Sequence, residues 1–162
     1  MELRLPERVL RVIAEEARRR GTTLEGVIIE KFVEGLDPGS RVEVYMELFE
    51  RYLSDAEESF REGDLPQAGE KYWGAVTALL NAIGELEGLP HYSHRDYVDI
   101  VEHLAEKYND PEISTLFGLA ERLHANFYHN FLRRRTFERH REGVLLLIEK
   151  LKSVIKSPTR GG

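Results

Sequence analysis

Residues 63–88 read GDLPQAGEKYWGAVTALLNAIGELEG, and this stretch decides the fold. A glycine stands at each end, and Asp64 with Pro66 is typical of the first turn of a helix. Apolar residues recur between the glycines at helical spacing: Leu65, Ala68, Tyr72, Ala75, Val76, Leu79, Ile83 and Leu86. We therefore predict one long amphipathic helix in this stretch.

The same periodicity extends over the flanking sequence, from residue 41 almost to the end of the chain. A stripe from Val42 to Phe60 predicts the preceding helix, and a helix that opens near residue 111 should run to about Leu132. Helix starts are expected at Ser93 with Asp96, at Asp110 with Pro111, and at Thr136. Short connections favour antiparallel neighbours, so the expected fold class is all-α: an up-and-down antiparallel helical bundle of about five helices.

The N-terminal part of the chain has a different pattern. Residues 2–5 alternate polar and apolar, which predicts a short strand, and a helix should follow from Pro6 to about Arg20. Thr22 with Glu25 has the spacing of a capping box, so a second helix is expected after it.

The sequence Asp-Pro-Gly-Ser at residues 37–40 is a turn pattern and indicates a domain boundary. We find no internal repeat. The expected parts are an arm of residues 1–37, a helical bundle of residues 40–156 and a disordered tail of residues 157–162.

The composition is that of a soluble globular protein, with 41% apolar and 32% charged residues among 162. No apolar run approaches the roughly 18–20 residues that cross a bilayer, and the N-terminus has no signal pattern, so we expect a cytoplasmic protein with no membrane partner. The absence of cysteine excludes disulfides, a thiol nucleophile and thiolate metal sites. A single Gln beside many Glu and Arg favours a thermophilic source.

Charge is distributed unevenly along the chain. From His129 onward nine Lys and Arg stand against three acidic residues, a net charge of +6, whereas the whole chain carries −6. The C-terminal part therefore holds either a phosphate-binding patch or an ordinary solvated helix face.

Residues 121–135, ERLHANFYHNFLRRR, carry the candidate chemistry. On a helical wheel His124 falls on the apolar face, one turn before Tyr128, so we interpret this pair as structural. A buried imidazole needs a hydrogen-bond partner, and Glu70 and Tyr72 are the candidates.

Arg122, Asn126 and His129 fall on the opposite side of the same predicted helix, which makes them the candidate catalytic set. Histidine can take the proton of a 2′-hydroxyl and a guanidinium can hold a phosphate, so these residue types suit RNA cleavage. Three interpretations remain open: a catalytic set in which Asn126 supports the other two residues, a binding surface without turnover, and a solvated or dimer-contact face.

A run of cations follows this set. Arg133, Arg134 and Arg135, with Arg139 close behind, extend the end of the predicted helix. Cations at a helix C-terminus complement the helix dipole, which accounts for one or two of them. The others are candidate nucleic-acid contacts.

His91 and His94 form a His-x-x-His pair in a predicted turn. Two imidazoles are a weak metal signal, and capping or loop packing explains them better. We therefore expect no metal site and no other cofactor.

Residues 1–36 resemble a ribbon-helix-helix module, with the strand at 2–5, a helix, a Gly-Thr-Thr turn and a second helix. This resemblance implies that two chains pair their strands, with Leu3 and Leu5 inward and Glu2 and Arg4 outward toward DNA. The segment holds seven basic and seven acidic residues, so it is poorly equipped to neutralise phosphates. We therefore expect dimerisation from the arm rather than DNA binding.

Residues 40–156 resemble the archaeal PaREP family of HEPN-type helical proteins. The resemblance is carried by segments within residues 63–75, by Ser93-His94-Arg95 and by Leu123-His124-Ala125-Asn126-Phe127-Tyr128. It implies a HEPN-like bundle that forms a homodimer. Many HEPN-type proteins are metal-independent endoribonucleases, often toxins, that use a closely spaced Arg and His, here Arg122 and His129.

The expected function is binding of RNA, another nucleic acid or a nucleotide, with metal-independent RNA cleavage as its enzymatic form. Two alternatives remain open. The first is a non-enzymatic dimeric scaffold for protein interaction, and the second is a DNA-binding regulator that acts through the N-terminal arm.

Overall fold

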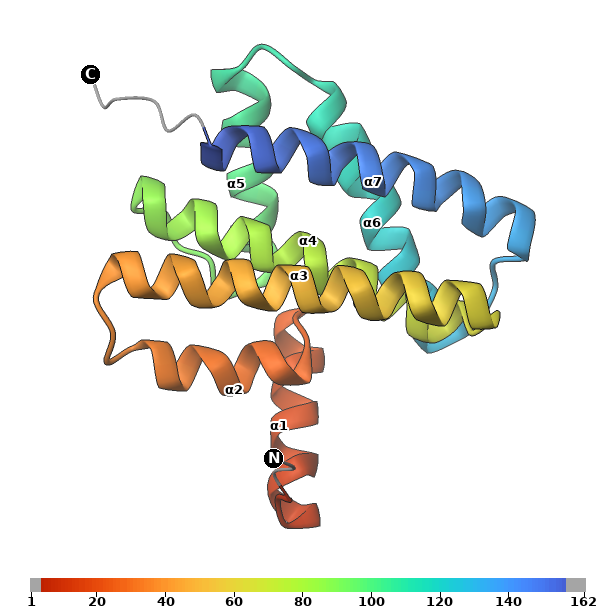
Figure 1. Ribbon diagram of the computed structural model, residues 1–162, viewed down its shortest axis with the longest axis horizontal. Helices are drawn as coiled ribbons and strands as arrows, with labels where there is room; N and C mark the ends of the chain where they lie inside the picture. The colour runs from red at the N-terminus through yellow and green to blue at the C-terminus, as the bar shows by residue number, and fades with distance from the viewer. Residues whose placement is uncertain (1–3, 157–162) are drawn as a thin grey trace.

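The computed structural model of the protein describes residues 4–156 (Figure 1). Within that range the chain forms seven α-helices and no strand. They are α1 (Glu7–Arg20), α2 (Leu24–Val33), α3 (Pro38–Glu62), α4 (Leu65–Glu87), α5 (His94–Lys107), α6 (Glu112–His129) and α7 (Arg134–Lys156). None of these helices is long and apolar enough to cross a membrane.

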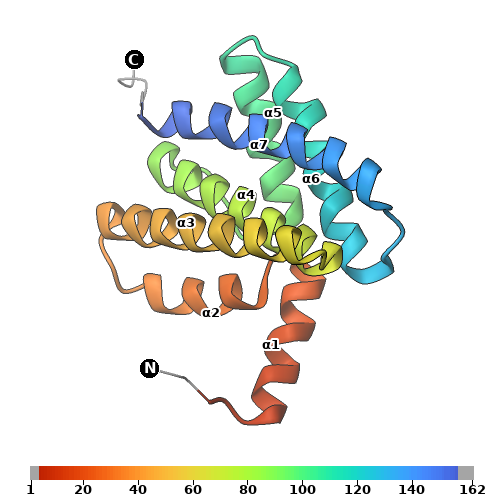
Figure 2. The same cartoon turned by 45° about the vertical axis from the view of Figure 1, so that its right-hand side comes forward.

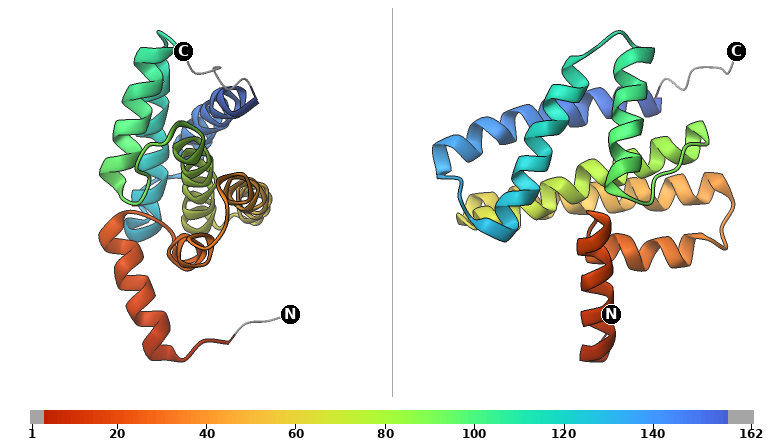
Figure 3. Two further views of the ribbon diagram at one scale, coloured as in Figure 1. Left: turned by 90° about the vertical axis from the view of Figure 1, so that its left-hand side faces the viewer. Right: turned by 180° about the vertical axis from the view of Figure 1, so that it is seen from behind.

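The long helix expected within residues 63–88 is confirmed, and α4 is the centre of the molecule. Every residue from Tyr72 to Gly84 is buried, and α3, α5, α6 and α7 all contact α4. A helix that is apolar on one face only can be covered from one side, whereas α4 is enclosed all round. α4 therefore packs between α3 on one side and α5 and α6 on the other (Figure 3).

α3 and α4 form an antiparallel hairpin whose turn matches the sequence prediction. Gly63 ends α3 with φ +83°, a conformation that glycine adopts without strain. The Asp64 side chain then accepts a hydrogen bond from the backbone N–H of Gln67 at 3.1 Å, which caps α4.

The up-and-down arrangement expected for the bundle is only partly present. α3, α4 and α7 run roughly alongside one another, but α5 and α6 form a second antiparallel pair that crosses them (Figure 3). Short connections make consecutive helices neighbours, yet side-chain packing sets the angle at which they cross.

The turn pattern at residues 37–40 is the start of α3 and not a separate connection. The Asp37 side chain accepts a hydrogen bond from the Ser40 N–H at 3.1 Å, and Pro38 occupies the first helical turn. Similarly, the N-cap of α2 is Thr23, whose hydroxyl accepts from the Gly26 N–H at 3.0 Å, and not Thr22.

The strand predicted at residues 2–5 is not seen, because Arg4 and Leu5 have no strand pairing. Glu2 and Leu3, like the tail at 157–162, lie outside the described residues. α1 projects away from the body (Figures 1 and 2). Its C-terminal end is attached by the Trp73 indole, which donates to the Gly21 carbonyl at 3.1 Å.

Candidate functional site

α6 presents two chemically different faces. Its outward face carries Arg122 and His129, which are both exposed. The two residues are seven apart on one helix and therefore lie about 10 Å apart along its axis on nearly the same side. The Arg122 guanidinium lies 5.3 Å from the centre of the Phe131 ring, and that ring is 45% exposed. Both side chains are accessible, as expected from the sequence.

Asn126 does not belong to that surface, which corrects the sequence interpretation. Its side chain is fully buried, and its Oδ1 accepts a hydrogen bond from the backbone N–H of Leu132 at 2.7 Å. The helical wheel assumed that α6 continues to Leu132, whereas the chain turns back and covers Asn126. Asn126 is therefore a structural residue at this turn.

The end of α6 causes this change. α6 ends at His129, and Asn130 adopts the left-handed conformation with φ +44°. α7 begins at Arg134, two residues before the predicted cap Thr136, because the Arg133 carbonyl accepts from the Phe137 N–H at 2.9 Å. Asparagine tolerates the left-handed region better than most residues, so the signal for this break was present in the sequence.

The triple arginine therefore does not extend the C-terminal end of one helix. Arg133 lies in the turn, while Arg134 and Arg135 open α7, where the helix dipole is positive. The explanation through the helix dipole is thus wrong for these residues, since cations at this end are disfavoured by the dipole.

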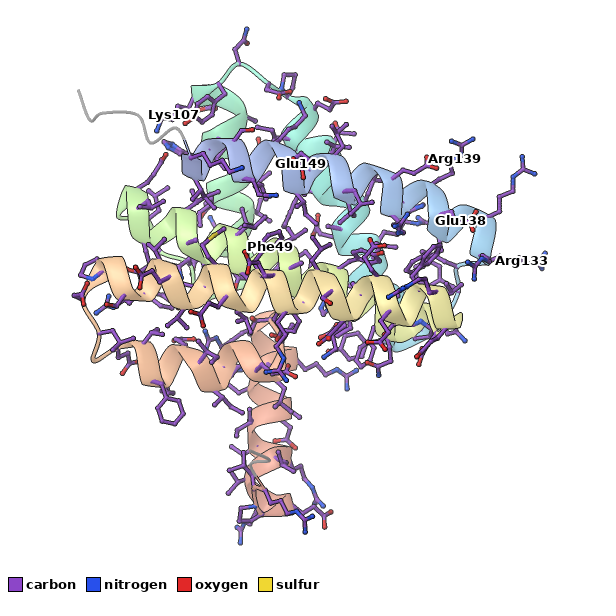
Figure 4. All side chains as sticks on the ribbon, in the orientation of Figure 1. Phe49, Lys107, Arg133, Glu138, Arg139 and Glu149 are labelled. Carbon is purple, nitrogen blue, oxygen red and sulfur yellow. The ribbon has the colours of Figure 1, made fainter. Side chains whose placement is uncertain are left out.

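Acidic and aromatic neighbours hold two of the candidate arginines. Arg134 contacts Glu138 at 3.1 Å and lies 4.7 Å from the centre of the Phe60 ring. Arg139 forms an ion pair with Glu142 at 3.1 Å, and Figure 4 shows this side chain on the outer side of α7.

The remaining exposed candidates form what we call the basic corner: the three arginines Arg122, Arg133 and Arg135, together with His129. Within residues 4–156, none of these four side chains makes an ion pair or a side-chain hydrogen bond. Figure 4 shows Arg133 projecting away from the body at the end where α6 and α7 join. The corner therefore keeps its hydrogen-bond donors for a ligand.

Arg141 stands next to this region but is part of the structure. Its guanidinium donates to Tyr72 Oη at 2.6 Å and to Glu57 at 2.5 Å. Burial alone would lower the pKa of Arg141, but the hydrogen bonds to Glu57 and Tyr72 outweigh it and the pKa is raised. Sequence reasoning did not identify this cluster, which joins α3, α4 and α7.

The inward face of α6 carries His124. Its Nδ1 lies 2.9 Å from a carboxylate oxygen of Glu70, one of the two partners considered from the sequence. The imidazole also stacks on the Trp73 indole, with ring centres 4.9 Å apart, and meets the Tyr128 ring edge-on. These contacts join α6 to α4.

His91 and His94 point to different parts of the molecule. His91 is buried and lies within 3.1 Å of the Asn81 side chain and 2.9 Å of Glu85, both on α4. His94 lies 2.7 Å from Glu121 on α6. No group of three or more His, Asp or Glu side chains within the described range is arranged to hold a metal ion.

The model of the Archaeal PaREP1/PaREP8 family matches residues 44–148, which is more than half of the chain, and the protein belongs to this family. The matched range includes both faces of α6 and the basic corner, while α1 and α2 lie outside it. No curated protein and no solved structure matches the chain.

Proposed function

We propose that this member of the archaeal PaREP1/PaREP8 family binds RNA or a nucleotide through the basic corner. The observation that carries the proposal is the set of exposed arginines at the α6–α7 turn that form no ion pair within residues 4–156, in a chain whose net charge is −6. An acidic protein has many carboxylates with which to neutralise its arginines. Arg134 and Arg139 form such ion pairs, whereas Arg133 and Arg135 form none in the part of the chain that the structure describes.

The residue types at the corner suit a single-stranded ligand. Arg133 and Arg135 can hold phosphate oxygens through charge-assisted hydrogen bonds. Phe131 offers an exposed ring on which a base can stack, and the Arg122 guanidinium beside it can extend that platform.

RNA cleavage is the enzymatic form of this proposal, and it rests on the resemblance to HEPN-type proteins. In that role the neutral His129 imidazole takes the proton of the 2′-hydroxyl as the 2′-oxygen attacks the phosphorus, and Arg122 stabilises the charge that develops on the phosphate oxygens. The P–O5′ bond breaks, a 2′,3′-cyclic phosphate forms, and the leaving 5′-oxygen takes up a proton from His129 or from water. None of these steps requires a metal ion. The same resemblance implies homodimerisation. The two copies of this face come together only if each lies at the dimer interface.

Binding is tested by titrating a fluorescent single-stranded RNA at low salt and following anisotropy. The Arg133→Gln/Arg135→Gln variant should lose affinity about tenfold or more, because two phosphate contacts are removed, and its salt dependence should fall by about two phosphate equivalents. Arg51→Gln, at an exposed position on α3, is the matched control and should bind like the wild type. Equal affinity of all three proteins would refute the corner as the binding surface.

Cleavage is tested separately, by incubating structured RNA with the protein in EDTA. His129→Ala should abolish cleavage while retaining most of the RNA affinity. If the wild type does not cleave, or if both proteins cleave equally, the enzymatic form fails and binding without turnover remains.

A dimeric scaffold is the alternative function, and one observation favours it. α1 projects from the body with Val9, Leu10 and Val12 exposed, and Phe32 of α2 is 73% exposed. Several exposed apolar side chains on these two helices are typical of a protein contact. A Val12→Asp variant that shifts the measured mass from dimer to monomer, together with no RNA binding by the wild type, would favour the scaffold.

The DNA-binding alternative has less support. A ribbon-helix-helix protein contacts DNA through a strand, and Arg4 and Leu5 are not in a strand. If deletion of residues 1–36 leaves DNA affinity unchanged, this alternative is eliminated.

A further inference from the structure

A hollow of about 420 Å³ lies between α1 and the body of the protein. No residue of the basic corner lines it. Its walls come from α1, the start of α2, the first turns of α4 and the last turns of α6. α1 contributes Ala14 and Ala17, and side chains this small leave the space open. Phe127 and Leu24 complete an apolar floor. The volume falls within the range of small-molecule sites.

The walls are fixed by contacts on either side of the hollow. The Trp73 indole donates to the Gly21 carbonyl, which ties the end of α1 to α4. On the opposite wall, the Tyr128 ring packs edge-on against His124, which Glu70 holds in place. A site whose walls are held before the ligand arrives loses little entropy on binding.

Two cations in the hollow keep hydrogen-bond donors free. The Arg18 guanidinium lies 5.5 Å from the centre of the Tyr128 ring and has no hydrogen bond from its side chain among residues 4–156. Lys71 Nζ forms an ion pair with Glu25 at 3.7 Å, a distance too long for a hydrogen bond, so its N–H groups can still donate. Both can therefore donate to a carboxylate.

Two carboxylates in the same hollow keep acceptor oxygens free. Glu15 has no ion pair or side-chain hydrogen bond within the described part of the chain, and Glu70 uses only its Oε2, toward His124. Burial raises the pKa of Tyr128, Glu70 raises it further and Arg18 opposes the rise, so charges of both signs act on one wall.

This pattern selects among ligand classes. A simple anion would be attracted by the cations but repelled by Glu15 and Glu70, and a simple cation would meet Arg18 and Lys71. An uncharged apolar ligand would remove charged groups of the lining from water without compensation. A zwitterion with an apolar body satisfies both signs and fills the floor.

We propose that the hollow binds a free α-amino acid with an apolar side chain. The apolar side chain occupies the space beside Ala14 and Phe127. Arg18 and Lys71 hold the carboxylate, and Glu15 and Glu70 hold the ammonium group. The site does not depend on the basic corner, so either can fail without the other.

The full-length protein offers a direct readout, because Trp73 is its single tryptophan and stacks on His124 behind the wall of the hollow. Its fluorescence is followed during titrations with L-phenylalanine, 3-phenylpropionate and phenethylamine, which carry both charges, the negative charge alone and the positive charge alone. L-phenylalanine should bind about tenfold or more tightly than either analogue, since each lost charged hydrogen bond costs at least that much.

Three variants sharpen the test, each checked for unchanged helix content by circular dichroism. Arg18→Gln should weaken L-phenylalanine and phenylpropionate but not phenethylamine, and Glu15→Gln should weaken L-phenylalanine and phenethylamine but not phenylpropionate. Ala14→Leu narrows the apolar part of the hollow and should weaken binding of all three. Arg8→Gln, on α1 outside the hollow, should bind like the wild type.

Absence of saturable binding by the wild type overturns the proposal. So does equal affinity for all three probes, which would indicate a plain apolar hollow. Unchanged affinity in Ala14→Leu would place any observed binding elsewhere.

Discussion

The two faces of α6 each carry a histidine, and the two side chains differ in burial and in hydrogen bonding. His124 is mostly buried, hydrogen-bonded to Glu70 and stacked on Trp73, whereas the His129 side chain is exposed and has no hydrogen bond within residues 4–156. A side chain whose bonds are all made within the fold stabilises that fold. One that keeps its bonds open on a basic surface is available to a ligand.

The same contrast applies to the arginines. Arg141 is committed to Glu57 and Tyr72, while Arg133 and Arg135, close by in the sequence, have no partner in the described part of the chain. Residue type alone therefore does not distinguish a structural cation from a binding cation. The distinction depends on whether a neighbouring helix places a carboxylate within reach, as α3 does with Glu57 for Arg141.

The largest effect is expected where the inward face of α6 touches α4. A Cβ at Gly69 would lie 2.5 Å from the Leu123 carbonyl oxygen, which is backbone and cannot move aside cheaply. Gly69→Ala should therefore lower the free energy of unfolding by about 2–4 kcal/mol, measured by chemical denaturation. Gly118→Ala, where a Cβ meets nothing within 4 Å, is the control and should not destabilise. Equal stability of the two variants would contradict this close packing.

The next effect compares the two histidines directly. His124→Ala removes the partner of a partly buried carboxylate and a stacked ring, so it should lower the free energy of unfolding by about 1–3 kcal/mol. His129→Ala should change it by less than about 0.5 kcal/mol. Urea unfolding followed by circular dichroism measures both variants. A reversed order would mean that the two faces are assigned the wrong way round.

Asn126 tests whether the α6–α7 turn is built from inside. Asn126→Ala leaves the buried Leu132 N–H without its acceptor and should cost about 1–2 kcal/mol of stability. It should also weaken RNA binding indirectly, because the turn positions Arg133 and Phe131. Unchanged stability of Asn126→Ala would contradict the structural role assigned to this side chain.

The smallest effect concerns the residue that ends α6. Asn130 has φ +44°, so Asn130→Ala should cost about 1 kcal/mol, whereas Asn130→Gly should be neutral or slightly stabilising. Thermal unfolding of the two variants provides the comparison. Similar melting temperatures would indicate that the chain does not need the left-handed conformation here.

Much of the fold could be predicted from local signals. Gly63 with Asp64 marks the α3–α4 turn, and the apolar periodicity of residues 65–86 marks the central helix, because capping and burial patterns are local properties. The contact between His124 and Glu70 was one of two candidates, since a buried imidazole needs a partner.

The site could be predicted less well, because it depends on where one helix stops. A helical wheel placed Asn126 on the outward side, and a helix continued past His129 left nothing to cover that side chain and joined the three arginines to α6. A single residue, Asn130, ends that helix, and the chain then folds back over Asn126. The angle at which α5 and α6 cross α4 (Figure 3) could not be predicted either, since it follows from tertiary packing.

The most direct test of the two-face account is to crosslink single-stranded RNA to the protein with ultraviolet light and to map the modified residue by mass spectrometry. We expect crosslinks at Phe131, on the basic corner, and none at Tyr128, which is similarly exposed but lines the hollow beside α1. Crosslinks at Tyr128, or only at residues of α1 or α3, would contradict it.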